Sequence, residues 1–212
     1  HATYLLNTGD VTVLTDPIFS ERASPVGWAG PKRLIPPAMS LEQLPSIDVV
    51  VISHNHYDHL DLPSLKVLQK NNPNLVFLVP QGDKTLLDSH GLSNVSEFRW
   101  WQNIQINHTE FTFTPVQHWS GRGITGRNTS LWGGWFLKSP NLSIYHAGDT
   151  GYSNDFVATQ MRLGTPDVAF IPIGAYKPRW FMKNQHVNPA EAVQIALDLK
   201  VTRSFAMHWG TF

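Results

Sequence analysis

The sequence contains no cysteine and few charged residues. Among its 212 residues Cys is 0, which excludes disulfides, thiolate nucleophiles, iron–sulfur clusters and cysteine-ligated zinc sites. Lys+Arg total 16 and Asp+Glu total 16, so the chain lacks the basic excess of nucleic-acid-binding proteins and we expect no nucleic-acid partner. Charged residues make up 15% of the chain against 42% for hydrophobic residues, a composition typical of a folded domain.

Long apolar runs are also missing. No stretch of about 18 apolar residues is present, so the sequence predicts no transmembrane helix, and no N-terminal segment resembles a signal peptide. The length suits one domain over residues 1–212. Because the chain starts at His1 rather than Met and stops at Phe212 just after a strand-like run, we expect an incomplete piece of a longer protein, in which targeting signals would not be visible.

Mixed α/β structure is predicted by short β-branched runs that alternate with turns and helix-like stretches. An uninterrupted apolar run from Val49 to Ile52 is typical of a strand buried on both faces, as in layered folds with helices over the sheet. The predicted strands cover residues 11–15, 48–53, 75–79, 109–116, 131–137, 142–146, 168–173 and 204–208. The predicted helices run from Asp61 to Asn72, from Asp83 to His90 and from Asn188 to Leu199, with Asp61 and Asn188 as N-caps.

Histidine is the residue that stands out, with 10 in the chain. His54, His56, Asp58 and His59 follow the buried strand directly. Residues two apart in extended backbone point the same way, so His54 and His56 converge on one point. Asp58 and His59 lie where the chain must turn and can face a second point. Burying so many polar groups costs several kcal/mol unless something binds them, which favours metal ions over packing.

Three further candidates each follow a predicted strand: His118, Asp149 and His208. Strand ends at one sheet edge commonly present functional side chains, although each of these residues alone also fits an ordinary strand end. Two metal ions with nitrogen and oxygen ligands need six or seven such groups, and one carboxylate can bridge both ions. The two sets of candidates together meet that number.

The motifs around these residues resemble the metallo-β-lactamase superfamily. One branch, the N-acylphosphatidylethanolamine-hydrolysing phospholipase D family, matches in particular, through long segments at residues 14–20, 30–33, 53–61, 117–119, 147–152, 171–176, 179–182 and 208–212. The resemblance spans essentially the whole chain and implies an α/β (α+β) fold, the four-layer αβ/βα sandwich. It also implies that the family's chain extends beyond both ends of this sequence, with edge elements of the sandwich outside it.

The resemblance further implies two zinc ions per chain. His54, His56 and His118 would hold one zinc, Asp58, His59 and His208 the other, and Asp149 would bridge them. Two such ions lower the pKa of a shared water and clamp phosphate oxygens. Asp149 and Asp58 are therefore expected to serve catalysis, and the implied reaction releases an N-acylethanolamine and phosphatidic acid from N-acylphosphatidylethanolamine.

Substrate contacts are expected from residues 179–186, whose aromatic and flexible apolar side chains suit an acyl chain. Trp180, Gln185 and His186 are the candidates. The resemblance implies that Gln185 and His186 approach the substrate, with His186 either a polar contact or a proton donor to the leaving group; otherwise His186 is a helix-entry histidine satisfied locally. Asp16 is either an acceptor that fixes a ligating imidazole or part of an ordinary Asp-Pro turn.

Two alternative functions remain open on the sequence alone. The same metals could act at carbon, as a zinc-dependent lactonase or esterase, because the fold supports both reactions; or the chain could be a lipid-binding module with incidental metal. For the first reading we expect a phospholipid substrate, peripheral contact with a membrane, a homodimer, and a cytoplasmic or peripheral membrane location.

Overall fold

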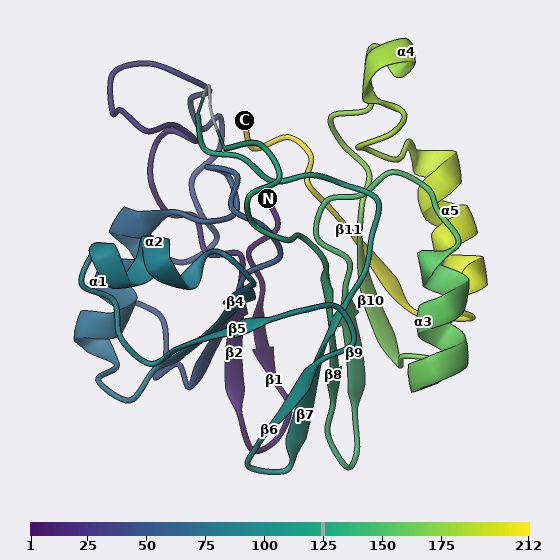
Figure 1. The fold of residues 1–212 in the computed structure, drawn as a ribbon, viewed down its shortest axis with the longest axis horizontal. Coiled ribbons are helices and arrows are strands. Elements are labelled where there is room, and N and C mark those ends of the chain that lie inside the picture. Colours follow the sequence, from purple (N-terminus) through teal and green to yellow (C-terminus); the bar gives the residue numbers. More distant parts are fainter. Residues whose placement is uncertain (124–125) are drawn as a thin grey trace.

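The computed structural model describes residues 1–123 and 126–212. It contains two β-sheets that lie face to face (Figure 1). The first sheet has the order β1-β2-β3-β4-β5, formed by β1 (Leu5–Asn7), β2 (Thr12–Thr15), β3 (Val49–Val51), β4 (Val76–Pro80) and β5 (Val95–Phe98). Strand β1 is antiparallel to β2, and the other pairs in this sheet are parallel.

The second sheet has the order β11-β10-β9-β8-β7-β6. Its strands are β6 (Asn103–Ile106), β7 (Thr109–Thr114), β8 (Gly134–Lys138), β9 (Ser143–His146), β10 (Val168–Pro172) and β11 (Ser204–Met207). Strands β9, β10 and β11 are parallel to one another. Their carboxyl ends therefore meet at one edge of the sheet.

Helices cover the outer face of each sheet. In Figure 1, α1 (Leu62–Asn71) and α2 (Lys84–Ser89) lie outside the first sheet, and α3 (Asp155–Leu163) and α5 (Pro189–Asp198) lie outside the second. The short α4 (Arg179–Met182) stands apart at the top of the view. This αβ/βα layering confirms the predicted fold class. Among the described residues, no helix is long and apolar enough to span a bilayer.

The buried strand β3 shows how the layers are held together. Its side chains Val49 and Val51 belong to the core between the two sheets, together with Trp135 and Phe113 of the second sheet. Val50 points the other way, into the core under α1 and α2. All three valines are 0% exposed, so burial on both faces explains the uninterrupted apolar run.

Most predicted elements are present, but the sequence did not predict β1, β5, β6, α3 or α4. The strand predicted from residue 131 starts only at Gly134. Asn188 caps α5 as expected, in a reciprocal capping box with Glu191. Asp61 stands at the N-cap of α1 without a side-chain bond to its backbone; its carboxylate accepts hydrogen bonds from the hydroxyls of Ser20 and Ser64 instead.

The two sheets touch at the residues that precede the candidate ligands. Gly133 N–H donates to the carbonyl of Ser53 over 2.9 Å. A Cβ added at Gly148 would lie 2.6 Å from Ser53 Cβ, and Gly148 has a φ of +62°. Glycine is thus required twice at this position, for its left-handed backbone and for the close approach. Since Ser53 precedes His54 and Gly148 precedes Asp149, this contact sets the distance between the two ligand loops.

Gly148→Ala should therefore destabilise the protein more than Gly91→Ala does. Both positions have positive φ, but nothing lies within 4 Å of a Cβ built at Gly91, so that variant reports the backbone cost alone. The overpacking against Ser53 should add about 1–3 kcal/mol to the loss of unfolding free energy. Urea denaturation of the two variants measures the difference, and equal losses would contradict this account of the sheet contact.

Candidate metal centre

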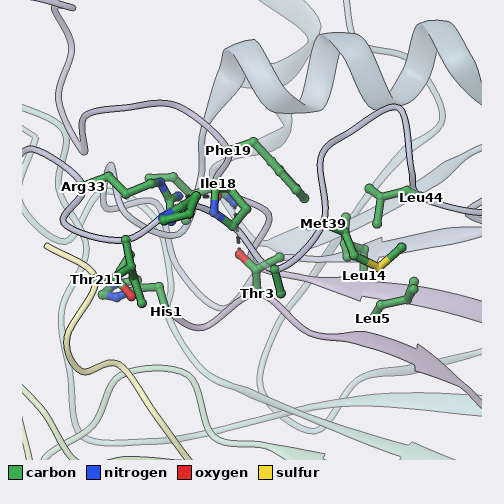
Figure 2. Close-up of a pocket in the computed structure, with 14 residues that line it drawn as sticks. His1, Thr3, Leu5, Leu14, Ile18, Phe19, Arg33, Met39, Leu44 and Thr211 are labelled. Carbon is green, nitrogen blue, oxygen red and sulfur yellow. Dashed lines mark hydrogen bonds between the residues drawn. The ribbon is translucent and has the colours of Figure 1, made fainter.

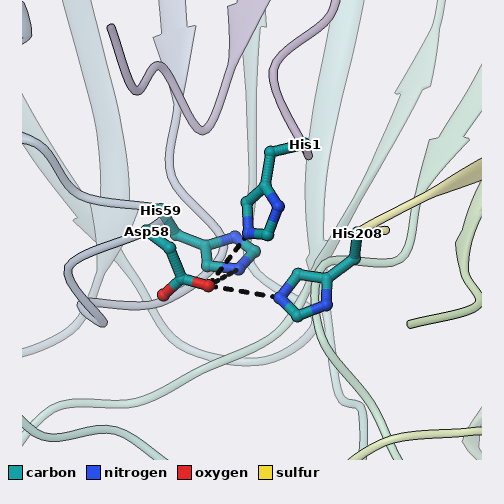
Figure 3. A group of neighbouring side chains, drawn as sticks. All are labelled: His1, Asp58, His59 and His208. Atoms are coloured by element: carbon teal, nitrogen blue, oxygen red, sulfur yellow. Dashed lines mark hydrogen bonds and ion pairs between the residues drawn. The ribbon is translucent and has the colours of Figure 1, made fainter. Parts of the chain in front are cut away.

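The structure brings all seven predicted ligands together at the strand ends of both sheets. They lie in the loops that follow β3, β7, β9 and β11 and form overlapping groups of potential metal-binding atoms. One group is His54, His56 and His118, and another is Asp58, His59 and His208 with the additional His1. Figure 3 shows the second group, in which the three imidazoles surround the carboxylate of Asp58.

The first group places three imidazole nitrogens close to one another. His56 Nδ1 lies 2.8 Å from His54 Nε2 and 3.3 Å from His118 Nε2. In a tetrahedral site with bonds of 2.0–2.1 Å, ligand atoms are separated by about 3.3 Å. The spacing of these nitrogens fits such a site.

The other nitrogen of two of these rings is held by an acceptor. His118 Nδ1 donates to the carbonyl oxygen of Gln185 over 2.9 Å. The Ser53 hydroxyl gives its hydrogen to Asp16 Oδ2 over 2.7 Å, so it accepts from His54 Nδ1 over 2.9 Å. Both rings therefore keep the Nε2 lone pair directed into the group, as metal-ligating histidines do.

The second group converges in the same way. Asp58 Oδ2 lies 3.2 Å from His208 Nε2 and 3.5 Å from His59 Nε2. Burial alone would lower the pKa of His208, but the carboxylates of Asp149 and Asp58 outweigh it and raise the pKa to about 9. The same two carboxylates, with Asp16, raise the pKa of His59 against the effect of burial. This group is thus the more negative of the two and attracts cations.

Asp149 lies between the two groups. Its Oδ2 is 3.0 Å from His208 Nε2 and 3.3 Å from His59 Nε2, and 3.9 Å from the Nε2 atoms of both His54 and His118. Its side chain is only 2% exposed. A carboxylate in this position can contact ions held by either group.

Asp16 is the acceptor that fixes the His59 ring. Of the two roles considered for Asp16, the hydrogen bonds therefore favour an acceptor for a ligating imidazole over an ordinary Asp-Pro turn. Its Oδ2 accepts hydrogen bonds from His59 Nδ1 at 2.8 Å and from His146 Nε2 at 2.9 Å, while the Ser53 N–H donates to Oδ1. Burial would raise the pKa of this carboxyl, but His59 and His146 outweigh that effect and hold it at about 2. Asp16 therefore stays ionised and directs the His59 Nε2 lone pair toward Asp58 and Asp149.

In the two groups, the buried atoms His59 Nε2 and Asp149 Oδ1 have no hydrogen-bond partner among the described residues. Buried polar atoms are normally satisfied. The convergent nitrogens and carboxylates, their spacing and these unsatisfied atoms together fit metal ions. An all-nitrogen-and-oxygen set of this kind suits zinc or another first-row transition metal.

His1 is a member of the second group that the sequence did not reveal. Its Nε2 lies 2.9 Å from Asp58 Oδ2, and its side chain is 6% exposed. The hairpin formed by β1 and β2 is the feature that could have indicated His1. Because β1 is antiparallel to β2, the residues before β1 lie at the carboxyl ends of the parallel strands β2 and β3.

The structure also places two of the three predicted substrate contacts beside the metal groups. His186 Nδ1 lies 3.9 Å from Asp149 Oδ2, and its ring stacks on that of His208. Gln185 and His186 both line a cleft of about 500 Å³ that opens over Asp58, Asp149 and His208. Burial lowers the pKa of His186, which favours the neutral imidazole.

Trp180 is not among the residues that line this cleft, and its contact with substrate stays a prediction. Its side chain is 85% exposed, and the cleft is lined by the next two residues of α4, Phe181 and Met182. Neighbouring residues of a helix point in directions about 100° apart. Trp180 therefore faces solvent when Phe181 and Met182 face the cleft.

A second hollow of about 300 Å³ lies behind His1. Figure 2 shows His1 and Thr211 at one end of it and Leu5, Leu14 and Met39 at the other. It shares no lining residue with the cleft. His1 therefore stands between an apolar hollow and the metal groups.

Comparison with known proteins gives a family. A model described as the beta-lactamase superfamily domain matches residues 11–209. The chain belongs to the beta-lactamase superfamily. The solved structure of a possible metal-dependent hydrolase from Veillonella parvula superposes with a TM-score of 0.79 at 20% identity, covering 99% of this chain and 83% of that one. This likeness confirms the superfamily fold.

The resemblance to the phospholipase D branch is also confirmed. The chain is 40% identical to N-acyl-phosphatidylethanolamine-hydrolyzing phospholipase D 1 of Caenorhabditis elegans, over 100% of this chain and 62% of the relative. It is 39% identical to the mitochondrial protein of that name from Saccharomyces cerevisiae, over 94% and 44%. The chain thus spans less than two thirds of the length of either relative. The two His/Asp groups of this superfamily chain are thus a candidate metal centre.

A buried polar network supports the ligand loop of this superfamily site from behind. Asn55, between His54 and His56, donates through Nδ2 to Asp83 Oδ1 over 2.8 Å and accepts at Oδ1 from Gly121 N–H. Arg122 Nη1 donates to the carbonyls of Asn55 and Leu60. Asp83 is 1% exposed, and burial raises its pKa to about 6.

Asp83→Asn should raise the free energy of unfolding above that of the wild type, and it should do so more at neutral pH than at acid pH. The folded protein keeps the Asp83 proton up to pH 6 while the unfolded chain loses it near pH 4, so this group lowers stability as pH rises between the two values and does so fully above pH 6. The substitution removes a cost of about 3 kcal/mol at pH 7 and little at pH 4. Urea denaturation at both pH values measures it. Asp88→Asn, on the same helix but exposed, is the control, and a pH-independent difference would contradict the assignment.

Proposed function

We propose that the protein is a dizinc phosphodiesterase of the phospholipase D type that hydrolyses N-acylphosphatidylethanolamine. The observation that carries the proposal is the pair of ligand groups on either side of Asp149 at the floor of one cleft. Asp149 Oδ2 lies within 3.9 Å of nitrogens of both groups, as expected for two ions that act together on one phosphate. The 40% identity to the Caenorhabditis elegans phospholipase D supports the choice of substrate.

In the proposed reaction, water attacks phosphorus and the bond from phosphorus to the ethanolamine oxygen breaks. The leaving oxygen takes up a proton, which gives phosphatidic acid and an N-acylethanolamine. Two bound zinc ions would supply Lewis-acid stabilisation of the charge on the phosphate oxygens and would lower the pKa of the attacking water.

The residues of the chain orient the participants. Asp16 and the Gln185 carbonyl fix the rings of His59 and His118. His186 lies at the cleft wall beside Asp149. Burial disfavours the protonated form of its imidazole, and two bound zinc ions would disfavour that form further. We therefore assign His186 the role of a neutral hydrogen-bonding contact to the substrate rather than that of a proton donor.

A peripheral membrane surface is part of this proposal. The cleft is lined by Ala23 and Pro31 of one loop and by Phe181 of α4. Trp28 lies in the same loop and Trp180 lies next to Phe181, and the two indoles are 81% and 85% exposed. Exposed tryptophans around a cleft suit the lipid headgroup region, where their rings are partly apolar and partly hydrated.

The catalytic proposal is tested with lipid and lactone substrates at equal enzyme concentration. The zinc-loaded protein should release N-acylethanolamine from N-acylphosphatidylethanolamine in mixed micelles and turn over the lactone far more slowly. His56→Ala should lower lipid turnover at least about 100-fold by removing a metal ligand. His108→Ala, which removes an exposed histidine, should not.

Faster turnover of the lactone than of the lipid would favour the lactonase or esterase alternative. Full lipid turnover by His56→Ala would refute the dizinc mechanism, and turnover of neither substrate by the zinc-loaded protein would favour a binding module.

The surface proposal is tested with vesicles of N-acylphosphatidylethanolamine and phosphatidylcholine. The double variant Trp28→Ala, Trp180→Ala should bind these vesicles more weakly, by about tenfold for two lost aromatic anchors, with unchanged turnover of a soluble phosphodiester. Met161→Ala removes a side chain that is 78% exposed on α3 and serves as control. Equal vesicle binding by both variants would contradict the proposed surface.

A further inference from the structure

The side chain of His1 forms a hydrogen bond with Asp58, one of the predicted metal ligands. Its Nε2 approaches Asp58 Oδ2 to 2.9 Å, and Figure 3 shows the ring lying against Asp58 from the side of the N-terminal segment. His59 and His208 approach the carboxylates of both Asp58 and Asp149. Among the described residues, His1 pairs with Asp58 alone. It therefore lies at the outer side of the second ligand group, away from Asp149.

The His1 ring is fixed on several sides. Its centroid lies 4.2 Å from that of the His208 ring and 5.1 Å from that of the Phe212 ring, which it meets edge-on. The His1 carbonyl accepts a hydrogen bond from the His208 N–H over 3.0 Å, and the next carbonyl, that of Ala2, accepts from the Thr15 hydroxyl. The backbone of residues 1–2 is thus tied to β2 in one sheet and to the end of β11 in the other.

The chemistry of this contact defines the state of the imidazole. A carboxylate only accepts hydrogen bonds, so Nε2 carries the hydrogen that His1 donates to Asp58. The remaining ring nitrogen, Nδ1, is buried and has no partner among the described residues. His208 Nε2 makes a similar contact with Asp58 but also lies 3.0 Å from Asp149 Oδ2, as a ligand close to both carboxylates does. His1 approaches Asp58 alone among the described residues, so its nitrogen has the position of a donor to the ligand rather than that of a ligand to the ion.

Asp58 needs such a donor more than Asp149 does. Its side chain is 26% exposed, against 2% for Asp149, and it lies in a turn where rotation about its χ angles would move the oxygen away from His59 and His208. A hydrogen bond to a ligating carboxylate limits that rotation. We propose that His1 is a positioning residue of the second metal position, where it holds Asp58 in the orientation that completes the group with His59 and His208.

This inference rests on the proposed function for the presence of two metal ions but not on the identity of the substrate. Loss of an outer hydrogen bond of this kind typically weakens metal binding about 10–100-fold. The expected loss is confined to the second position, because His1 is not part of the group formed by His54, His56 and His118.

The experiment measures metal binding by the full chain and by two variants. His1→Phe keeps a ring against His208 and Phe212 but removes the donor. His1→Gln places an amide N–H near the position of Nε2 but provides a poor metal ligand. Zinc stoichiometry, chelator competition and the absorption bands of the cobalt-substituted protein give the affinity and geometry at each position. His108→Phe, at an exposed site, is the matched control, and thermal unfolding checks that every variant is folded.

Wild type and His108→Phe should bind two ions. His1→Phe should bind one with unchanged affinity and the other about 10–100-fold more weakly, with altered cobalt bands, and His1→Gln should recover most of the loss. Unchanged binding of both ions by His1→Phe would overturn the inference alone. Equal losses in both variants would also overturn it, since they would make His1 a direct ligand. A wild-type protein that binds fewer than two ions would overturn the proposed function together with the inference.

Discussion

The buried carboxylate of Asp16 is the contact on which the metal centre depends. It stands at the end of β2 and accepts hydrogen bonds from the backbone and hydroxyl of Ser53 and from the rings of His59 and His146. These partners come from the loop after β3 and from β9, so one side chain joins three strands of two sheets. An unpaired buried carboxylate is costly. The strands must therefore end where these donors can reach Asp16, and this places the ligand loops opposite each other.

The rest of the centre follows from the way parallel strands end. The loops after β3, β9 and β11 open on the same side because these strands lie in parallel pairs within each sheet, and the face-to-face packing of the sheets brings the two edges together (Figure 1). Gly148 permits the close approach to Ser53, and the Gly133 N–H donates to the Ser53 carbonyl. The positions of the ligands are thus set by rigid elements, while the cleft above them is formed by loops and α4, which can vary without disturbing the ligands.

The ligands could be predicted because their signals are local. His54, His56, Asp58 and His59 adjoin one apolar run, and His118, Asp149 and His208 each follow a recognisable strand. His1 could not be found in this way. Strand β1 has only three residues, of which only Leu6 is buried, so no local pattern predicts the strand or its pairing with β2. Helix α3 was missed for a similar reason: it buries only Phe156 and Thr159. The exposure of Trp180 depends on the rotation of a four-residue helix, which composition does not encode.

The charges of the centre explain why its histidines are divided between two electrostatic environments. Burial lowers the pKa of His118 to about 3 and that of His56 to about 4, so the first group offers neutral nitrogens. In the second group Asp149 and Asp58 raise the pKa of His208 to about 9, so the carboxylates that attract a metal ion attract a proton to the same nitrogen. An ion that binds the second group therefore competes with a proton at the His208 nitrogen. The two positions are chemically unequal although they share Asp149, and the more proton-dependent one is the position whose carboxylate His1 contacts.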